Sequence, residues 1–122
     1  PSIKCIEHAA FCGCKNLKRV NLSDGLEIIG ADSFFGCESL ETIILPITLK
    51  KIYEYAFAGC GSLQEIVIQS SVTSIGDAAF GDCNNLKAIY VPKKKVDYYK
   101  KRFPADMHWL IVEEGSDFPV KP

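Results

Sequence analysis

Residues 75–92 read IGDAAFGDCNNLKAIYVP, and the same arrangement of apolar residues returns at every 23rd position of the chain. A phenylalanine, a cysteine and a leucine mark this register most clearly. The three columns are Phe11, Phe34, Phe57 and Phe80; Cys14, Cys37, Cys60 and Cys83; and Leu17, Leu40, Leu63 and Leu86. Because the columns keep step without an insertion, the chain is an array of repeats rather than one irregular domain.

Each repeat contains one short strand, which is clearest in residues 40–45. The alternation there places Ile43 and Leu45 toward the interior and Thr42 and Ile44 toward the outside. One strand in a repeat of about 20 to 29 residues is typical of leucine-rich repeats. The sequence therefore predicts a leucine-rich-repeat solenoid, mostly β, in which a parallel sheet gains one strand per 23-residue coil.

The rest of each coil is predicted from the same columns. A second, shorter extended piece is expected at residues 26–29, 49–52 and 72–75. A 3₁₀ or single turn should follow, because the next segment is too short for a regular α-helix. The phenylalanines are expected to stack inside the coil. Short polar residues before the leucine column are expected to bond the backbone of their own turn: Asn16, Ser39, Ser62 and Asn85.

The period ends after Val91, which divides the chain into two parts. Residues 1–92 hold the repeats, with a partial first coil followed by four in register. Residues 93–122 are predicted to form a C-terminal cap and a tail. The cap is expected to cover the last coil, because repeat arrays need a terminal unit with a polar outer side.

The cap is predicted to be a short helix followed by a closing strand. The helix should end before Pro104, and residues 107–112 should form the strand. The apolar residues expected to cover the last coil are Val96, Tyr99, Phe103 and Trp109. Residues 115–122 are expected to be a loose tail or to lead onward.

The chain begins inside a repeat, since Ile3 aligns with Leu26, and it shows neither an initiator Met nor a recognisable leader. We therefore expect a mature form or an excised piece of a larger protein, with more repeats before Pro1. The alternative is that this edge packs against another copy of the chain.

Composition narrows the class of protein. The 122 residues are 48% hydrophobic and 24% charged, with a formal net charge of −1. Such a chain is expected to be soluble and globular, and no apolar run approaches the roughly 20 residues of a membrane span. The near-zero net charge argues against a nucleic-acid-binding protein, which normally carries a basic excess.

The repeat resembles the BspA-like leucine-rich repeats over residues 3 to 92. The residues that carry the resemblance are Ile75, Ala79, Phe80, Cys83, Leu86, Ile89, Val91 and Pro92. Ser23 and Gln69 depart from the pattern, where other repeats have proline. The resemblance implies surface or secreted proteins of bacteria and some protists, several of them implicated in adhesion. It implies no shared catalytic residues, and it makes an extracellular or cell-surface location the expected one.

Six cysteines do not by themselves predict a disulfide framework. Four of them form the cysteine column described above, in which the side chains of neighbouring coils point in parallel and give poor geometry for a disulfide. The column also spreads the four thiols along a line, so they cannot converge on one zinc ion. We therefore expect four buried thiols. Cys5 and Cys12 lie outside this column, and a Cys5–Cys12 or Cys12–Cys14 bridge is the alternative.

No catalytic or metal-binding pattern is present in the sequence. His8 and His108 are the only histidines, and neither has the spacing of a metal ligand. Cys12 lies four residues from His8, but nothing marks a third residue that would orient such a pair. The sequence contains no phosphate loop and no nucleophile elbow. We therefore predict a protein that is not an enzyme and that needs no metal or cofactor.

The outward side chains of the strands are the first candidate binding site. Ile44, Val67 and Tyr90 follow one another in one column, and contiguous exposed apolar residues often mark interaction sites. The alternative is that β-branched residues are simply favoured in sheets. Tyr53 and Tyr55 form a weaker patch on the opposite side. The full candidate set is Arg19, Asn21, Thr42, Ile44, Glu65, Val67, Ala88 and Tyr90.

The second candidate site is the basic run KKKVDYYKKR at residues 93–102. Such a run is either a solvated helix face or a patch for heparin-like glycans, anionic polymers or lipid headgroups. Its basic residues are Lys93, Lys94, Lys95, Lys100, Lys101 and Arg102.

These observations predict a non-enzymatic module for protein–protein interaction or adhesion, within a larger surface or secreted bacterial protein. The partner is expected to be a protein of a host or of a cell surface, with no nucleic acid and no membrane insertion. The alternatives are a structural stalk, a glycan binder that uses the basic cap, and an intracellular scaffold.

Overall fold

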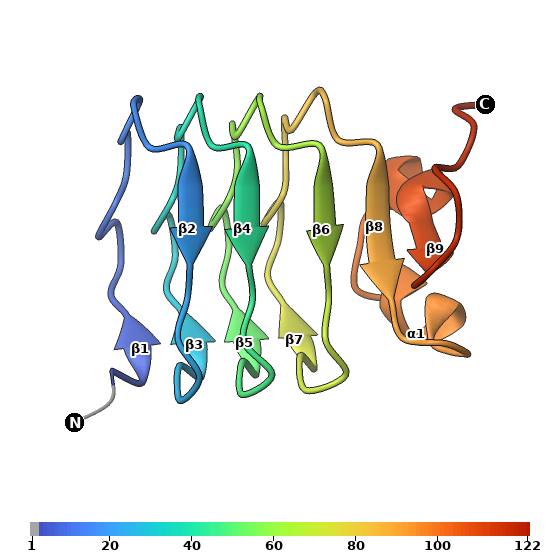
Figure 1. The fold of residues 1–122 in the computed structure, drawn as a ribbon, viewed down its shortest axis with the longest axis horizontal. Coiled ribbons are helices and arrows are strands. Elements are labelled where there is room, and N and C mark those ends of the chain that lie inside the picture. The colour runs from blue at the N-terminus through green and yellow to red at the C-terminus, as the bar shows by residue number, and fades with distance from the viewer. Residues whose placement is uncertain (1–2) are drawn as a thin grey trace.

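The computed structural model describes residues 3–122, which wind into a single stack of coils (Figure 1). Each coil contributes one main strand and one minor strand on opposite sides of the stack. The main strands are β2 (Arg19–Asn21), β4 (Thr42–Ile44), β6 (Glu65–Val67) and β8 (Ala88–Val91). The minor strands are β1 (Cys5–Ile6), β3 (Ile28–Ile29), β5 (Lys51–Ile52) and β7 (Ser74–Ile75). All pairings are parallel, so the predicted solenoid is confirmed.

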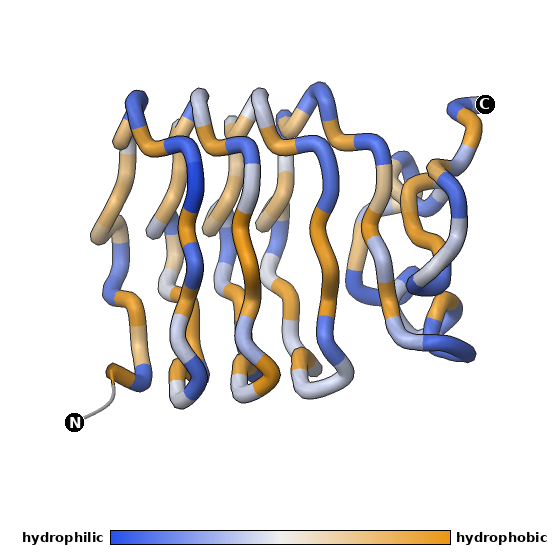
Figure 2. The backbone as a smooth tube through the Cα atoms, viewed as in Figure 1, coloured by the Kyte–Doolittle hydropathy of each residue, from blue (hydrophilic) through white to orange (hydrophobic). Residues whose placement is uncertain are grey.

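The minor strands form one continuous sheet in the order β1-β3-β5-β7. Its register pairs Ile6 with Ile29, Ile29 with Ile52, and Ile52 with Ile75, so each step is one repeat. These strands fall at the ends of the predicted extended pieces. Apolar residues recur at matching positions of successive coils (Figure 2).

The main strands are parallel but do not form one continuous sheet. β2 pairs with β4, whereas β6 pairs with β8, which also pairs with β9 (Ile111–Glu113). Within residues 3–122, no ladder of hydrogen bonds joins β4 to β6. We call this interruption the β4–β6 seam.

The phenylalanine column forms the centre of the core. The ring centroids of Phe11, Phe34, Phe57 and Phe80 are 5.3, 5.2 and 5.1 Å apart in turn. Phe103 follows Phe80 at 6.0 Å, and it lies 23 residues further along the chain. The stack is therefore continued by the cap. Phe11 is the exception to burial, since 43% of it is exposed at the outer side of the first described coil.

Each coil bends between its minor and main strands through a segment that we call the arc: residues 7–14, 30–37, 53–60 and 76–83. Two residues of every arc have a left-handed backbone, which prevents a regular helix. The first of the two has φ between 52° and 58°, and these residues are Ala9, Asp32, Tyr55 and Ala78. The second has φ between 56° and 75°, and these residues are Gly13, Gly36, Gly59 and Asp82. The expected tight turn is therefore present, as a series of turns rather than a helix.

The cysteines behave as small apolar residues that also donate hydrogen bonds. All six are free, so the alternative of a Cys5–Cys12 or Cys12–Cys14 bridge is wrong. The thiols of Cys37, Cys60 and Cys83 donate to phenylalanine carbonyls of the preceding coil at 3.2–3.3 Å. These three are buried, whereas Cys14 in the first coil is half-buried.

The short polar residues before the leucine column bond the preceding coil rather than their own turn. Ser62 Oγ donates to the Glu38 carbonyl at 2.7 Å, and Asn85 Nδ2 donates to the Gly61 carbonyl at 2.6 Å. The expectation of a bond within the same turn is therefore wrong for these two residues. The stack places the carbonyl of the neighbouring coil within reach, so these side chains link coils.

The cap follows β8 and consists of α1 (Val96–Lys100), the 3₁₀ helix η1 (Ala105–Leu110) and β9. The hydroxyl of the buried Tyr99 donates to the carbonyls of Gln69 and Val72, at 3.0 and 2.7 Å. The predicted closing strand is present as β9, but its predicted start at residue 107 is wrong, because Trp109 lies in η1 and the strand begins only at Ile111. Pro104, with φ −64°, directly precedes η1, where a proline costs no hydrogen bond. None of the helices in the described part of the chain is long and apolar enough to cross a membrane.

Candidate functional site

The outward residues of the main strands form a face with an apolar centre. In-register pairing places Ile44 beside Asn21 and Val67 beside Tyr90. Ile44 is 54% exposed and Val67 is 42% exposed, although both lie in strands. Two neighbouring branched apolar side chains are therefore accessible near the middle of this strand face.

Polar side chains flank these two residues. Arg19, Thr42 and Glu65 are exposed, as predicted from the alternation of the strands. The ion pairs found in residues 3–122 do not include Arg19 or Glu65. Their charges are therefore available at the surface, in the row of side chains two residues before the apolar pair along the strands.

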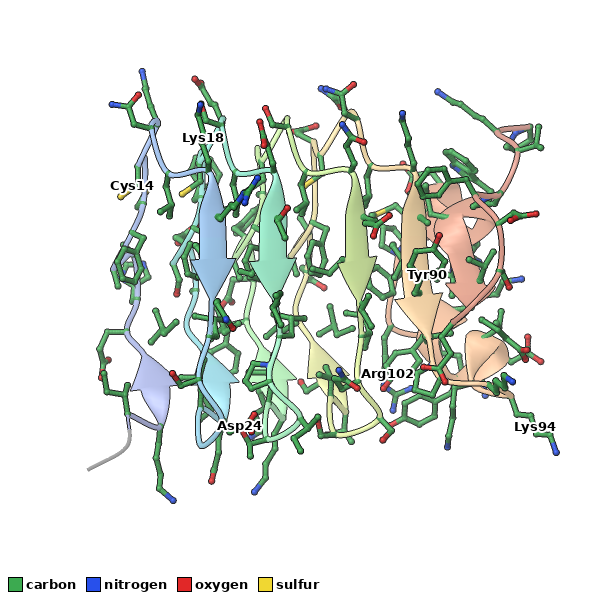
Figure 3. All side chains as sticks on the ribbon, viewed as in Figure 1. Cys14, Lys18, Asp24, Tyr90, Lys94 and Arg102 are labelled. Carbon is green, nitrogen blue, oxygen red and sulfur yellow. The ribbon has the colours of Figure 1, made fainter. Side chains whose placement is uncertain are left out.

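The C-terminal end of the strand face differs from the prediction. Ala88 is buried, so its expected exposure is wrong. Its side chain is a single methyl group, and β8 is hydrogen-bonded to a strand on each side. Tyr90 is half-buried (Figure 3), and burial, followed by the charges of Glu65 and Asp117, raises its pKa above the ordinary value.

The β4–β6 seam opens a cleft of about 630 Å³ in the middle of this face. Its lining includes Ile44, Val67, Thr42 and Glu65, which come from both sides of the seam. The sequence did not predict this cleft. All four main strands show the same alternation of residues, so no sequence signal distinguishes the interrupted step from the paired ones.

The backbone hydrogen bond that follows each paired main strand is missing at the β4–β6 seam. Leu22 N–H donates to the Ile44 carbonyl at 3.3 Å, and Ile68 N–H donates to the Tyr90 carbonyl at 2.8 Å. The equivalent bond from Leu45 N–H to the Val67 carbonyl is absent from the described residues. The step across the seam therefore lacks a backbone hydrogen bond that the paired steps on either side make.

The basic residues of the cap do not form one patch. Lys93, Lys94 and Lys95 are exposed next to one another, and Lys101 is exposed further along. Lys100 is half-buried. Figure 3 shows Lys94 and Arg102 at separate places on the cap. Only the first three lysines are therefore both exposed and consecutive in the chain.

Arg102 has a structural role in the cap. Its guanidinium donates to the carbonyls of Thr73 and Tyr98 at 3.0 and 2.8 Å, and it lies 3.6 Å from the centre of the Tyr98 ring. The bond to Thr73 links the cap to the preceding coil, and the contacts with Tyr98 fix the Arg102 side chain within the cap. Arg102 is accordingly less available for an anionic ligand than the three exposed lysines.

The residues that carry acid–base or metal chemistry are scattered. Within residues 3–122, no three His, Cys, Asp or Glu side chains lie close enough to hold a metal ion. His8 Nε2 lies 3.3 Å from Asp32 Oδ2 in a largely exposed pair. This pair links the surfaces of two neighbouring coils.

A stack of 23-residue coils with one main strand each defines a leucine-rich-repeat protein. The match to a family model is more specific: residues 1–105 match the BspA type leucine rich repeat region, with 6 copies. The chain belongs to this family. Leucine-rich-repeat families are generally non-enzymatic repeat proteins that mediate protein–protein interaction, and members of this one occur as bacterial surface proteins.

Solved structures of bacterial proteins are similar to this chain. A leucine rich cell surface protein from Faecalibacterium prausnitzii A2-165 is 35% identical, with a TM-score of 0.71 over 75% of this chain and 24% of that one. A leucine-rich repeat protein from Bacteroides capillosus ATCC 29799 is 35% identical, with a TM-score of 0.68 over 73% of this chain and 63% of that one. A leucine rich repeat protein from T. pallidum is 32% identical, with a TM-score of 0.57 over 72% of this chain and 52% of that one. The chain thus spans less than two thirds of each of these proteins. No match was found among curated proteins.

Proposed function

We propose that the chain is a non-enzymatic binding module of a larger surface or secreted bacterial protein, and that its strand face binds a protein partner. One observation carries this proposal. Ile44 and Val67, 54% and 42% exposed, both line the open cleft at the β4–β6 seam. Exposed apolar residues with a polar rim are the usual pattern of a protein interface.

The rest of the strand face supports a protein rather than a small molecule as the partner. Arg19 and Glu65 lie on the rim, where charged residues set orientation and partner choice. The stacked coils hold these side chains in place before binding, so association has few groups to order. Adhesion to a host or another cell is the form of this activity that the family resemblance favours.

The experiment compares the wild type with Ile44→Asp/Val67→Asp in pull-downs from host-cell surface fractions. A matched control is Ile47→Asp/Tyr53→Asp, which adds the same charges at two other exposed apolar residues. Circular dichroism checks that all three proteins are equally folded. We expect the strand-face variant to lose a partner that the wild type and the control both retain.

Other outcomes contradict the proposal in different ways. A partner that is lost equally from both variants, or from neither, does not bind the strand face. If the wild type captures nothing specific, the chain acts as a structural stalk or spacer.

A glycan-binding cap is the second candidate, supported by the adjacent exposed side chains of Lys93, Lys94 and Lys95. This activity should fall steeply with salt, because exposed charges are screened within about 8 Å at physiological ionic strength. Heparin binding that is lost when the three lysines are replaced by alanine supports it. Heparin binding that persists in that variant contradicts it.

A further inference from the structure

The backbone hydrogen bonds that join the arcs of successive coils run in one direction. In each arc, the backbone N–H groups of three alternate residues donate to carbonyls of the next arc. In the third arc these bonds are Tyr55 to Asp77 at 3.1 Å, Phe57 to Ala79 at 2.7 Å and Gly59 to Gly81 at 2.8 Å. An arc therefore presents a row of donors that the following coil satisfies.

The last arc, residues 76–83, keeps the same row of donors. Ala78, Phe80 and Asp82 occupy the three donor positions, but within residues 3–122 their N–H groups have no acceptor. Phe80 is only 2% exposed. Because a buried N–H without a partner is costly, this edge favours any ligand that supplies carbonyl oxygens.

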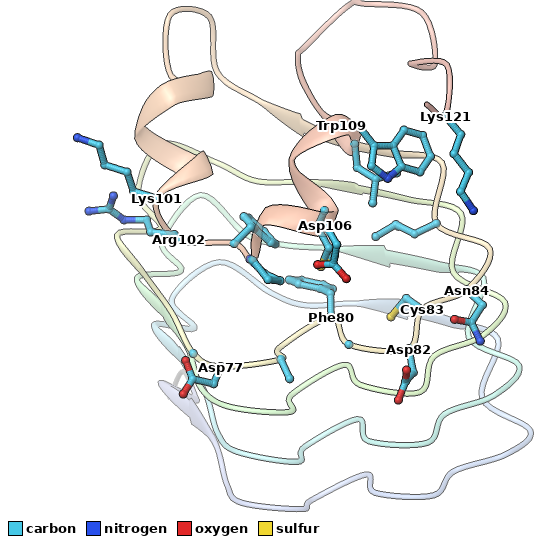
Figure 4. A pocket seen from close by; sticks show the side chains of 18 residues that line it. Asp77, Phe80, Asp82, Cys83, Asn84, Lys101, Arg102, Asp106, Trp109 and Lys121 are labelled. Carbon is cyan, nitrogen blue, oxygen red and sulfur yellow. The ribbon is translucent and has the colours of Figure 1, made fainter.

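A cleft of about 910 Å³ lies beside this edge, between the last arc and the cap (Figure 4). Phe80 and Asp82 line one wall, and Phe103, Pro104 and Asp106 of the cap line the other. This volume lies in the range of about 300 to 1,000 Å³ that is typical of ligand sites. The cleft is separate from the one at the β4–β6 seam.

The spacing of the donors selects the kind of ligand. Donors on alternate residues need acceptors at every second residue, which an extended peptide offers along one of its edges. A single phosphate or sulfate cannot reach all three N–H groups. In the preceding coils the same donors bond alternate carbonyls of a neighbouring chain segment, the next arc.

The charges around the cleft favour a basic peptide. Asp77, Asp82 and Asp106 all line it. Three cations line it as well, but the guanidinium of Arg102 is held by two backbone carbonyls, and Lys101 lies at the rim of the cleft in Figure 4. Lys121, at the opposite rim, is the remaining cation of the lining.

We propose that the cleft between the last arc and the cap binds an extended, lysine- or arginine-containing peptide segment of a partner protein by strand addition. The N–H groups of Ala78, Phe80 and Asp82 donate to alternate carbonyls of the peptide. The carboxylates of Asp77, Asp82 and Asp106 attract its basic side chains. Recognition that uses main-chain donors gives affinity, and the flanking side chains give specificity.

The test is an NMR titration of the ¹⁵N-labelled chain with an end-blocked hexapeptide of alternating alanine and lysine. We expect the amide protons of Ala78, Phe80 and Asp82 to move downfield and to exchange more slowly with solvent. A dissociation constant on the order of 1 mM or tighter is expected for so short a peptide.

Two double variants with equal changes in net charge sharpen the test. Asp77→Lys/Asp106→Lys reverses two charges in the cleft, whereas Asp24→Lys/Asp97→Lys reverses two exposed charges outside it. We expect the first to weaken binding about tenfold relative to the second.

Four results would overturn the proposal. The first is no shift at these three amides, and the second is equal binding by the two variants. The third is the same set of shifts with inorganic phosphate alone, which would identify a simple anion site. The fourth is shifts that grow with protein concentration before peptide is added, which would identify a second copy of the chain as the occupant.

Discussion

Replacement of Phe57 by alanine measures how much the stacked rings contribute to stability. Phe57 is fully buried, with ring neighbours at 5.2 and 5.1 Å on its two sides. Removal of such a ring from a packed core costs about 3–5 kcal/mol of the free energy of unfolding. Phe11 is 43% exposed and has one ring neighbour, at 5.3 Å. We therefore expect Phe11→Ala to cost only about 1–2 kcal/mol, since roughly half of its surface is buried.

The assay is urea-induced unfolding followed by circular dichroism, with wild type, Phe57→Ala and Phe11→Ala measured side by side. The expected result is a loss for Phe57→Ala that exceeds the loss for Phe11→Ala by about 2–3 kcal/mol. Equal losses, or a loss below about 1 kcal/mol for Phe57→Ala, would refute the reasoning that burial between two neighbouring rings sets the contribution of each phenylalanine.

Three further predictions concern the backbone and the thiols. Gly36→Ala should lower the free energy of unfolding by about 1–2 kcal/mol, because Gly36 has φ +72°. Gly61 has open space around it and no positive φ, so Gly61→Ala should leave the free energy of unfolding unchanged or raise it. Urea unfolding compares the two variants, and equal effects would contradict this argument. Burial raises the pKa of Cys60 to about 12 and that of Cys83 to about 11 from an ordinary 9.0. Since the neutral thiol is favoured in the folded state, stability should be complete below pH 9 and decline toward pH 12, as measured by thermal unfolding. Iodoacetamide at pH 8 should modify the exposed Cys12 first, as read by mass spectrometry, and early modification of Cys60 would contradict its burial.

The repeat register predicted most of the coil, because each apolar column has one packing role that every coil repeats. The inward and outward residues of β4 follow directly from the alternation, as the burial of Ile43 and exposure of Ile44 confirm. The two left-handed positions were missed. The second of them could have been found, because glycine stands at residues 13, 36 and 59.

The structure differs from the sequence-based prediction at the two ends of the stack, where a coil does not have another repeat on both sides. Phe11 has no described coil on its outer side, so its ring is exposed despite its place in the column. Trp109 lies in η1, where the chain leaves the repeat and no periodic pattern indicates its conformation. Phe103, by contrast, keeps the 23-residue spacing and continues the ring stack. The phenylalanine column therefore extends one repeat beyond the aliphatic columns, which end at Val91.

The candidate site was predicted only in outline. The exposure of Arg19, Thr42, Glu65 and Val67 follows from strand alternation, and the burial of Ala88 does not. The cleft at the seam lies where no strand ladder joins β4 to β6. The two strands show the same alternation of residues as the paired ones, so no single residue indicates the interruption.

The one-way hydrogen bonds of the arcs impose an order on how the molecule is made. A ribosome releases the N-terminal coils first, and the arc of each coil gains its acceptors only when the next 23 residues have left the exit tunnel. Every newly released coil thus supplies the carbonyl acceptors for the arc of the preceding coil, while the N–H donors of its own arc still face water. Translation and folding can therefore advance together, with native structure always about one repeat behind the growing end of the nascent chain.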